Sequence, residues 1–169
     1  MIRVQTEPFD VGAEIGAFCR AGGSSGGSTG GSVGASIGGV ATFVGLVRDH
    51  RGDTSEDAVP LQALTLEHYP GMTERQLERI EAEARRRWDL RDVLVIHRYG
   101  RMEPEEPIVL VCTAAAHRGP ALQSCQFLID WLKTRAPFWK CEETPDGAHW
   151  VEARDTDEAA TARWEESLP

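Results

Sequence analysis

Apolar and polar positions along the chain follow two repeats, one typical of strands and one of helices. Strands are predicted where Val, Ile, Thr and aromatic residues form short apolar or alternating runs bounded by turn residues. These runs lie at residues 39–50, 61–69, 92–100, 107–116, 138–143 and 148–154. The last two flank the turn sequence TPDG and are expected to pair with each other.

A helical repeat of apolar residues begins after the turn pair Pro70-Gly71. Over residues 73–88 apolar side chains recur at intervals of three and four, and charged residues alternate on the other positions. Thr73 and Gln76 have the spacing of a capping box, so we expect the helix to begin there. Its alternating charges indicate a structural helix with a solvated outer face.

A second helix is predicted at residues 117–135. Pro120 suits its first turn, and Pro137 forces an end just beyond Arg135. A short acidic helix is also expected at about 156–166. The apolar stripe predicted for the second helix is Ala121, Leu122, Cys125, Leu128, Ile129 and Leu132.

The order of these elements limits the fold class. Several consecutive strands have short connections without a helix between them, which predicts an α+β fold with mixed or antiparallel pairing. At 169 residues the chain is expected to form a single domain, 1–169. A Gly/Ser-rich stretch at about 21–39 interrupts it and is predicted to be a flexible surface loop. It has no lysine after its last glycine, which a phosphate-binding loop requires.

Composition and charge exclude several functions. The formal net charge of −9 argues against a general nucleic-acid binder. The longest apolar run, residues 108–116, is too short to span a bilayer, and residues 1–20 lack the pattern of a signal peptide. The four cysteines form no Cys-x-x-Cys pair. We therefore expect a cytoplasmic protein without nucleic-acid or membrane partners, and with neither a metal site nor a cofactor.

Positive charge gathers in one segment of this acidic chain. The sequence KTRAPFWK, Lys133 to Lys140, carries three cations and no acid, whereas residues 142–169 carry a net −7. On a helical wheel Lys133 lies at the rim of the apolar face beside Ile129. Two interpretations stay open, a lysine at a pocket mouth that serves in catalysis, or an ordinary surface lysine with its stem on apolar surface.

Two other cationic positions lie where strands end. His117 and Arg118 stand at a strand–helix junction, where free backbone N–H groups favour anions, and Arg48 closes the strand at 39–50. For each of them the alternative is a capping or solvent-exposed side chain. Arg118 and Lys133 are fifteen residues apart, about 22 Å along a helix. One small ligand cannot reach both, so there are either two sites or one site completed by a second subunit.

Five segments in a fixed order carry a resemblance to a known family. They are LTLEHYPGMTE (64–74), VIHRYG (95–100), HRGPA (117–121), LKTRAPFWK (132–140) and WVEAR (150–154). Together they resemble the large, catalytic subunit of molybdopterin synthase, over about residues 9–164. The resemblance implies an α+β fold of the α/β-hammerhead type and a homodimer. Each subunit would bind a small ubiquitin-like sulfur carrier, which gives a heterotetramer.

The resemblance also implies a reaction. The carrier's C-terminal Gly-Gly tail, which bears a thiocarboxylate, enters a pocket, and two sulfurs pass to cyclic pyranopterin monophosphate to give molybdopterin. A non-catalytic docking module for a ubiquitin-like protein is the alternative. A phosphate-binding hydrolase with His117 as its base is a further possibility, although no metal motif accompanies that histidine.

Site residues follow from the resemblance motif by motif. Lys133 would be the main catalytic residue, close to the carrier's terminal carbonyl, and Lys140 a second cation that is either catalytic or orients the substrate. Arg48, His117 and Arg118 would hold the phosphate and pterin, the last two from the other subunit. The remaining expected pocket residues are Leu46, Val47, Cys141, Glu142 and Arg154. No sulfur relay through the cysteine is expected, because the sulfur arrives on the carrier.

Overall fold

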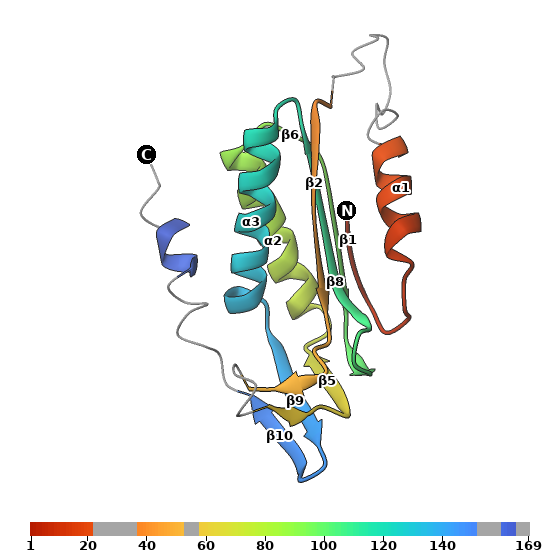
Figure 1. The fold of residues 1–169 in the computed structure, drawn as a ribbon. Helices are drawn as coiled ribbons and strands as arrows, with labels where there is room; N and C mark the ends of the chain where they lie inside the picture. The colour runs from red at the N-terminus through yellow and green to blue at the C-terminus, as the bar shows by residue number, and fades with distance from the viewer. Residues whose placement is uncertain (22–36, 53–57, 152–159, 165–169) are drawn as a thin grey trace.

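The computed structural model describes residues 1–21, 37–52, 58–151 and 160–164. Its larger sheet has four strands in the order β1-β6-β8-β2. A second four-stranded sheet lies at one end of the first (Figure 1), with the order β10-β9-β5-β7. The strands of the first sheet are β1 (Ile2–Gln5), β6 (Leu90–Arg98), β8 (Pro107–Ala115) and β2 (Gly39–Leu46).

The larger sheet is mixed and is covered on both faces. β1 runs parallel to β6, whereas β8 pairs antiparallel with both β6 and β2. Helices α2 (Met72–Arg87) and α3 (Arg118–Arg135) lie on one face and α1 (Val11–Ala21) on the other (Figure 1). Because both faces are covered, the central strands have long continuous stretches of buried residues. The predicted α+β class with a mixed sheet is confirmed.

The second sheet is entirely antiparallel. It consists of β5 (Ala63–His68), β7 (Gly100–Met102), β9 (Phe138–Thr144) and β10 (Gly147–Val151). The predicted pairing of two short strands around TPDG is therefore confirmed. The short strands β3 (His50–Arg51) and β4 (Val59–Pro60) pair beside it.

The described residues bury three apolar clusters. One lies between the larger sheet and helices α2 and α3, with the fully buried Phe127 beside the rings of Trp88 and Trp131. A second lies under α1, where Phe18 packs against β6 and β8. The third joins the two sheets and contains Val47 together with residues of β5. The two sheets are thus connected by apolar packing at the place where β2 ends.

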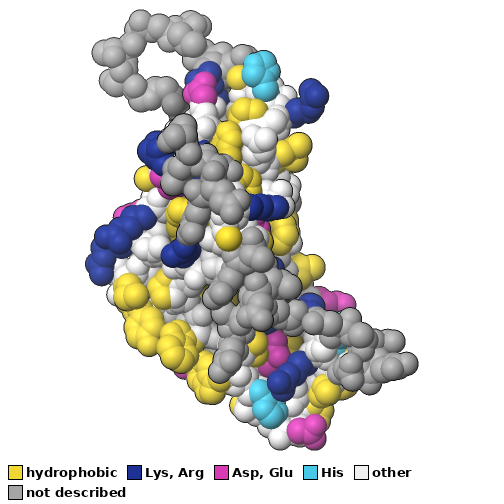
Figure 2. All heavy atoms as spheres, turned by 90° about the vertical axis from the view of Figure 1, so that its left-hand side faces the viewer, with side chains coloured by type: hydrophobic (Ala, Val, Ile, Leu, Met, Phe, Trp, Pro, Cys, Tyr) yellow, Lys and Arg dark blue, Asp and Glu magenta, His cyan; other side chains and the backbone are white. Residues whose placement is uncertain are grey.

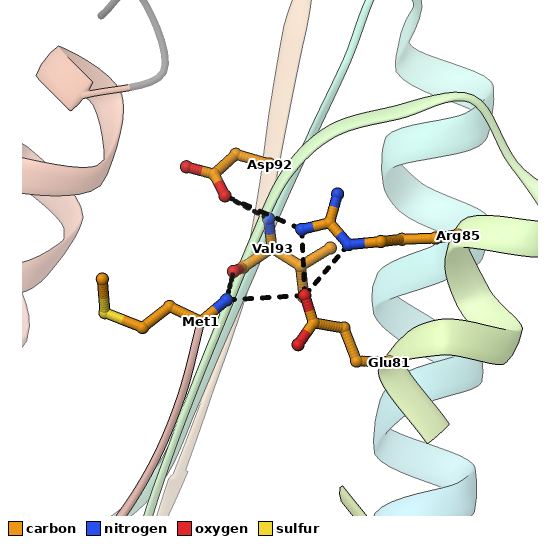
Figure 3. Close-up of polar contacts among 5 residues, drawn as sticks. All are labelled: Met1, Glu81, Arg85, Asp92 and Val93. Atoms are coloured by element: carbon orange, nitrogen blue, oxygen red, sulfur yellow. Dashed lines mark hydrogen bonds and ion pairs between the residues drawn. The ribbon is translucent and has the colours of Figure 1, made fainter. Parts of the chain in front are cut away.

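The sequence prediction lacked β1, α1 and β7, and it also lacked the short pair β3 and β4. The sequence held a signal for the start of α1, since Asp10 is a residue type typical of helix N-caps. In the structure its carboxylate accepts a hydrogen bond from the Ala13 N–H at 2.7 Å. Ile15 and Phe18 pack against the sheet at helical spacing. The chain's start is also anchored: the Met1 amine donates to the Val93 carbonyl at 2.5 Å (Figure 3).

An ion-pair network supports that anchor. Glu81 lies 3.4 Å from the Met1 amine and accepts a hydrogen bond from Arg85 Nε at 3.0 Å. The same arginine reaches Asp92 at 3.8 Å (Figure 3). Because these side chains come from α2 and β6, the network ties the parallel strand β1 to both layers.

The predicted start of the helix at residues 73–88 is wrong in detail. Helix α2 begins at Met72 after Gly71, whose positive φ of 76° suits glycine. The Gly71 N–H donates to Glu74 Oε2 at 2.5 Å, so this pair caps the helix. Thr73 is buried instead, and its hydroxyl accepts from the Tyr69 N–H at 3.2 Å. Gln76 has no part in a cap.

The helix predicted at residues 117–135 matches its prediction with one exception. α3 ends at Arg135 before Pro137, as expected. Leu122 is 60% exposed, so it does not belong to the buried stripe, whereas Ser124 and Phe127 do.

Two expectations fall partly or wholly outside the described residues. Most of the Gly/Ser stretch, 22–36, lies outside them, so its predicted flexibility stays a prediction. Of the predicted C-terminal helix, residues 160–164 are described and are helical. Among the described helices, none is long and apolar enough to cross a membrane.

Candidate functional site

A cavity of about 670 Å³ opens where the two sheets meet the C-terminal end of α3. Its walls come from the end of β2, from β5, from the last turns of α3 and from β9. Six of the ten residues expected at the site line it, and these are Leu46, Val47, Arg48, Lys133, Lys140 and Glu142. Residues far apart in the sequence thus meet at one place.

Most of the cavity wall is apolar. Leu64 and Leu66 of β5 contribute to it, as do Ile129 and Leu132 of α3. A small number of polar groups on apolar walls is typical of sites for organic ligands, because the polar groups then orient a molecule that the walls hold.

Both lysines of the chain line this cavity. The sequence contains two lysines, Lys133 and Lys140. Lys133 lies in the last turn of α3, beside Ile129 and after the buried Leu132, as the helical wheel predicted. Lys140 comes from β9 on the other side of the Pro137 turn. The fold therefore brings the ends of KTRAPFWK to one cavity.

On the face drawn in Figure 2, the Lys and Arg side chains of the described residues do not form a continuous surface. They lie at several separate places, with acidic and apolar side chains between them. This distribution agrees with charge gathered in a pocket. On this face the described residues offer no extended basic surface of the kind that nucleic-acid binders use.

A buried carboxylate holds one of the lysines. Lys140 and Glu142 are two positions apart on β9, so both side chains point to the same side of the sheet. Lys140 Nζ lies 2.8 Å from Glu142 Oε1, and Arg51 Nε lies 3.7 Å from Oε2. The Glu142 side chain is 7% exposed, and a buried carboxylate requires such partners. Glu142 therefore positions Lys140 at the cavity wall.

Cys141 is the expected site residue that turns away. It stands between Lys140 and Glu142 on β9, so its side chain points to the opposite face of the sheet. It is buried and opposes Thr65 and Trp150 in the neighbouring strands. Cys141 is not among the residues that line the cavity, so its expected place at the site stays a prediction.

His117 and Arg118 lie at the other end of α3. His117 is the N-cap of the helix and Arg118 its first residue, and neither lines the cavity. Arg118 instead lies beside the start of β2, where a methyl group added to Gly39 would come within 3.4 Å of its Cα. Within one chain these two residues are thus separated from Lys133 by the length of the helix. The remaining expected residue, Arg154, lies outside the described residues.

Several cavity residues were missed by the sequence analysis. His97, at the end of β6, lines the cavity with its ring stacked on Phe138, at a centroid distance of 3.9 Å and an interplanar angle of 12°. Burial lowers the pKa of His97 to about 4. His50 also lines the cavity, and its Nδ1 lies 2.5 Å from Asp49 Oδ1. A histidine at the end of a buried strand was the available signal.

Among the described residues, no group of three or more His, Cys, Asp or Glu side chains is placed to hold a metal ion. The cavity's chemistry therefore rests on cations, a paired carboxylate and two imidazoles. Such a site suits binding of anions and stabilisation of negative charge that develops during a reaction.

Solved structures with this arrangement of sheets are proteins of molybdopterin biosynthesis. The molybdopterin biosynthesis MoaE protein from Burkholderia ambifaria superposes with a TM-score of 0.73 and 49% sequence identity, over 98% of this chain and 97% of that one. A complex of subunits 1 and 2 of molybdopterin-converting factor from Helicobacter pylori matches with a TM-score of 0.67 over 90% of this chain and 91% of its own. At 18% identity, this second match shows a shared fold.

Sequence comparison gives the family. The MoaE protein family model matches residues 4–135. The molybdopterin synthase catalytic subunit of Cereibacter sphaeroides is 51% identical over 163 residues, which are 96% of this chain and 99% of that protein. The chain belongs to the MoaE protein family, the catalytic subunits of molybdopterin synthase. The family, fold class and enzyme class that the sequence predicted are confirmed.

Proposed function

We propose that this chain transfers sulfur from the thiocarboxylated C-terminus of a small ubiquitin-like carrier to cyclic pyranopterin monophosphate, and does so in the cavity between the two sheets. The observation that carries the proposal is the convergence of Arg48, Lys133 and Lys140, which come from the segment after β2, from α3 and from β9 and line one cavity. In each transfer the thiocarboxylate sulfur forms a bond to a pterin carbon in exchange for an oxygen, and water cleaves the bond between the sulfur and the carrier's carbonyl carbon, so that the carrier leaves as a carboxylate. Two transfers give molybdopterin.

The charges of the cavity match the charges of both reactants. The substrate carries a phosphate and the carrier tail a thiocarboxylate, so cations are needed to bring the two anions together. Attack at the tail's carbonyl develops negative charge on its oxygen, which a fixed cation stabilises. Lys133 has this catalytic role, and Lys140, which Glu142 holds in place, is the second catalytic cation.

The apolar walls suit the carrier tail. A Gly-Gly tail has no side chains, so it can pass in an extended form between walls that include Leu64 and Ile129. The apolar walls also exclude water, which strengthens the electrostatic interactions inside the cavity.

A second copy of the chain supplies His117 and Arg118 in this proposal. In the described part of the larger sheet β2 is an edge strand, and its Val40, Phe43 and Leu46 are exposed. An antiparallel pairing of two β2 strands about a two-fold axis sets the start of one beside the end of the other. Because Arg118 lies beside the start of β2, it then reaches the partner's cavity.

The dimensions agree with that pairing. The eight residues of β2 span about 26 Å at ~3.3 Å each, and Arg118 to Lys133 spans about 22 Å along α3. The homodimer would present two such composite cavities. With one carrier at each, the assembly is a heterotetramer.

The test is product formation by the purified protein. We would mix it with thiocarboxylated carrier and cyclic pyranopterin monophosphate, and detect molybdopterin as its oxidised fluorescent pterin. Lys133→Ala should bind the carrier yet make little product. Arg135→Ala, in the same segment but outside the cavity lining, is the matched control and should stay active. Carrier binding without product from the unaltered protein would instead indicate a docking module.

A further inference from the structure

His97 differs from the other polar groups of the cavity. Arg48, Lys133 and Lys140 are cations, and Glu142 is already paired with Lys140 and Arg51. The other imidazole of the cavity, His50, is paired with Asp49. The His97 side chain is buried, and it lines the cavity wall at the end of β6. Its chemistry is therefore that of a neutral imidazole among charged groups.

The hydrogen bonding of His97 defines its tautomer. Nδ1 lies 2.9 Å from the Arg98 carbonyl oxygen, and that oxygen can only accept, so Nδ1 carries the proton. Burial holds the pKa at about 4, so the ring has no second proton at neutral pH. Nε2 is thus a hydrogen-bond acceptor.

Nε2, the second ring nitrogen of His97, is not sealed in the protein interior. Within the described residues, the buried side-chain nitrogens and oxygens without a partner are Arg3 Nε and Trp131 Nε1. No described residue bonds to His97 Nε2, yet Nε2 is not among those buried atoms. It therefore reaches open space, and the open space beside His97 is the cavity. The stack on Phe138 keeps the ring in this orientation.

We propose that His97 Nε2 accepts a hydrogen bond from an N–H group of the bound pterin ring, which makes His97 a specificity-determining residue of the sulfur transfer. The inference rests on the proposed function. Cations recognise the phosphate, but they cannot accept from the N–H groups that distinguish a pterin from other phosphate esters. A buried N–H without a partner would weaken binding, so the cavity requires an acceptor at this point.

The cavity's other occupant also offers N–H groups, the amides of the carrier tail. The two sources are separable, because the pterin and the carrier bind as different molecules. If His97 binds the pterin, removal of the His97 side chain changes the KM for the pterin and leaves the affinity for the carrier unchanged.

Two substitutions separate recognition from structure. In His97→Asn the amide N–H can still donate to the Arg98 carbonyl, but the acceptor at Nε2 is lost. In His97→Gln the amide oxygen lies near the Nε2 position, so an acceptor is kept while the Arg98 bond is lost. Recognition through Nε2 predicts about a tenfold higher KM for the pterin in His97→Asn and a near-normal KM in His97→Gln, with little change in kcat.

The measurements are KM and kcat for the pterin, the carrier's dissociation constant, and the pterin's dissociation constant without carrier. Equal KM changes in both variants would overturn the proposal, because a structural role does not distinguish them. Weaker binding of the carrier, together with an unchanged KM for the pterin, would also overturn the proposal. Denaturation midpoints check that both variants fold. If one of them does not fold, His97→Phe replaces it, because the phenyl ring keeps the stack on Phe138. If the unaltered protein binds the pterin but does not turn it over, the proposed sulfur transfer is refuted. The dissociation constant of the pterin then still tests whether His97 recognises it.

Discussion

Gly45 stands where β2 turns toward the cavity, and we expect that a single methyl group there disturbs both stability and catalysis. It pairs with Val109 across the sheet, and the register shifts between Gly45 and Leu46. A Cβ at this position would lie 2.7 Å from Val109 Cγ1 and 3.4 Å from Phe43 Cε1. The first distance is well inside the ~3.5–4.0 Å of a normal carbon contact.

The expected cost of Gly45→Ala follows from this overlap. Val109 is β-branched and stiff at χ1, so it cannot easily turn its methyl group away. Overpacking of this kind costs about 1–3 kcal/mol of unfolding free energy. The alternative to strain is a shift of the strand end, which carries Leu46 and Arg48 to the cavity. Activity should therefore fall even at temperatures where the variant is fully folded.

A double-mutant cycle tests the reasoning. Val109→Ala removes the methyl group that Gly45→Ala would meet, at a cost of about 1 kcal/mol by itself. The double variant should be more stable than the sum of the two single effects by roughly 1–2 kcal/mol, and should regain activity. Urea denaturation and product formation measure the two. Additive effects, or a Gly45→Ala variant that behaves like the unaltered protein, would refute the described strand end.

Two further predictions concern the helical layer. Phe127→Ala should lower the unfolding free energy by about 3–5 kcal/mol in urea denaturation, because Phe127 is fully buried among tryptophan rings, whereas Leu122→Ala, at a residue 60% exposed, should change it by less than ~0.5 kcal/mol. Hydrogen bonds from Arg86, with Arg87 adding, hold the pKa of Glu83 at about 2, below its unfolded value of 4.5. The stabilisation from Glu83 is therefore present above pH 4.5 and lost as the pH falls toward 2. Glu83→Gln should be less stable than the unaltered protein by up to about 1 kcal/mol at pH 7 and equally stable at pH 2. An equal difference in stability at both pH values would show that ionisation of Glu83 has no part.

The sequence predicted the elements whose apolar repeat is long and bounded by clear turn residues. Helix α3 ends at Arg135 because Pro137 follows, and this boundary was predictable from one residue. α1 was missed because Gly12 and Gly16 weaken its helical pattern, although Ile15 and Phe18 keep the spacing. Its helicity depends on packing against the sheet, which a local pattern does not show.

The candidate site was predictable in part for a similar reason. Lys133 and Lys140 lie close together in the sequence, and the helical wheel predicted the rim position of the first; its place at a pocket followed only from the family resemblance. His97 and Phe138 are remote in sequence, and only the meeting of β6 with β9 brings their rings together. Cys141 was expected at the site through the family resemblance, whereas the alternation of a strand points its side chain to the face opposite Lys140 and Glu142.

The cap of α2 shows how tertiary contacts decide local details. The predicted cap residue Thr73 is buried, and its hydroxyl lies 3.5 Å from the Pro137 carbonyl, a contact between segments 64 positions apart. Gly71 takes the cap position because its backbone can adopt a positive φ. Both residues are compatible with a cap by sequence, and only the fold distinguishes them.

The central claim is a cavity that holds Lys133 of one subunit and Arg118 of another, and subunit mixing tests it most directly. Lys133→Ala and Arg118→Ala should each be nearly inactive alone. After subunit exchange, half of the dimers are mixed and each has one intact site, so activity should return to about a quarter of normal. Lys133→Ala mixed with Lys140→Ala is the control and should stay inactive, because those residues share one subunit. Recovery in the first mixture alone is the result that we predict; no recovery, with exchange verified, would contradict the composite site.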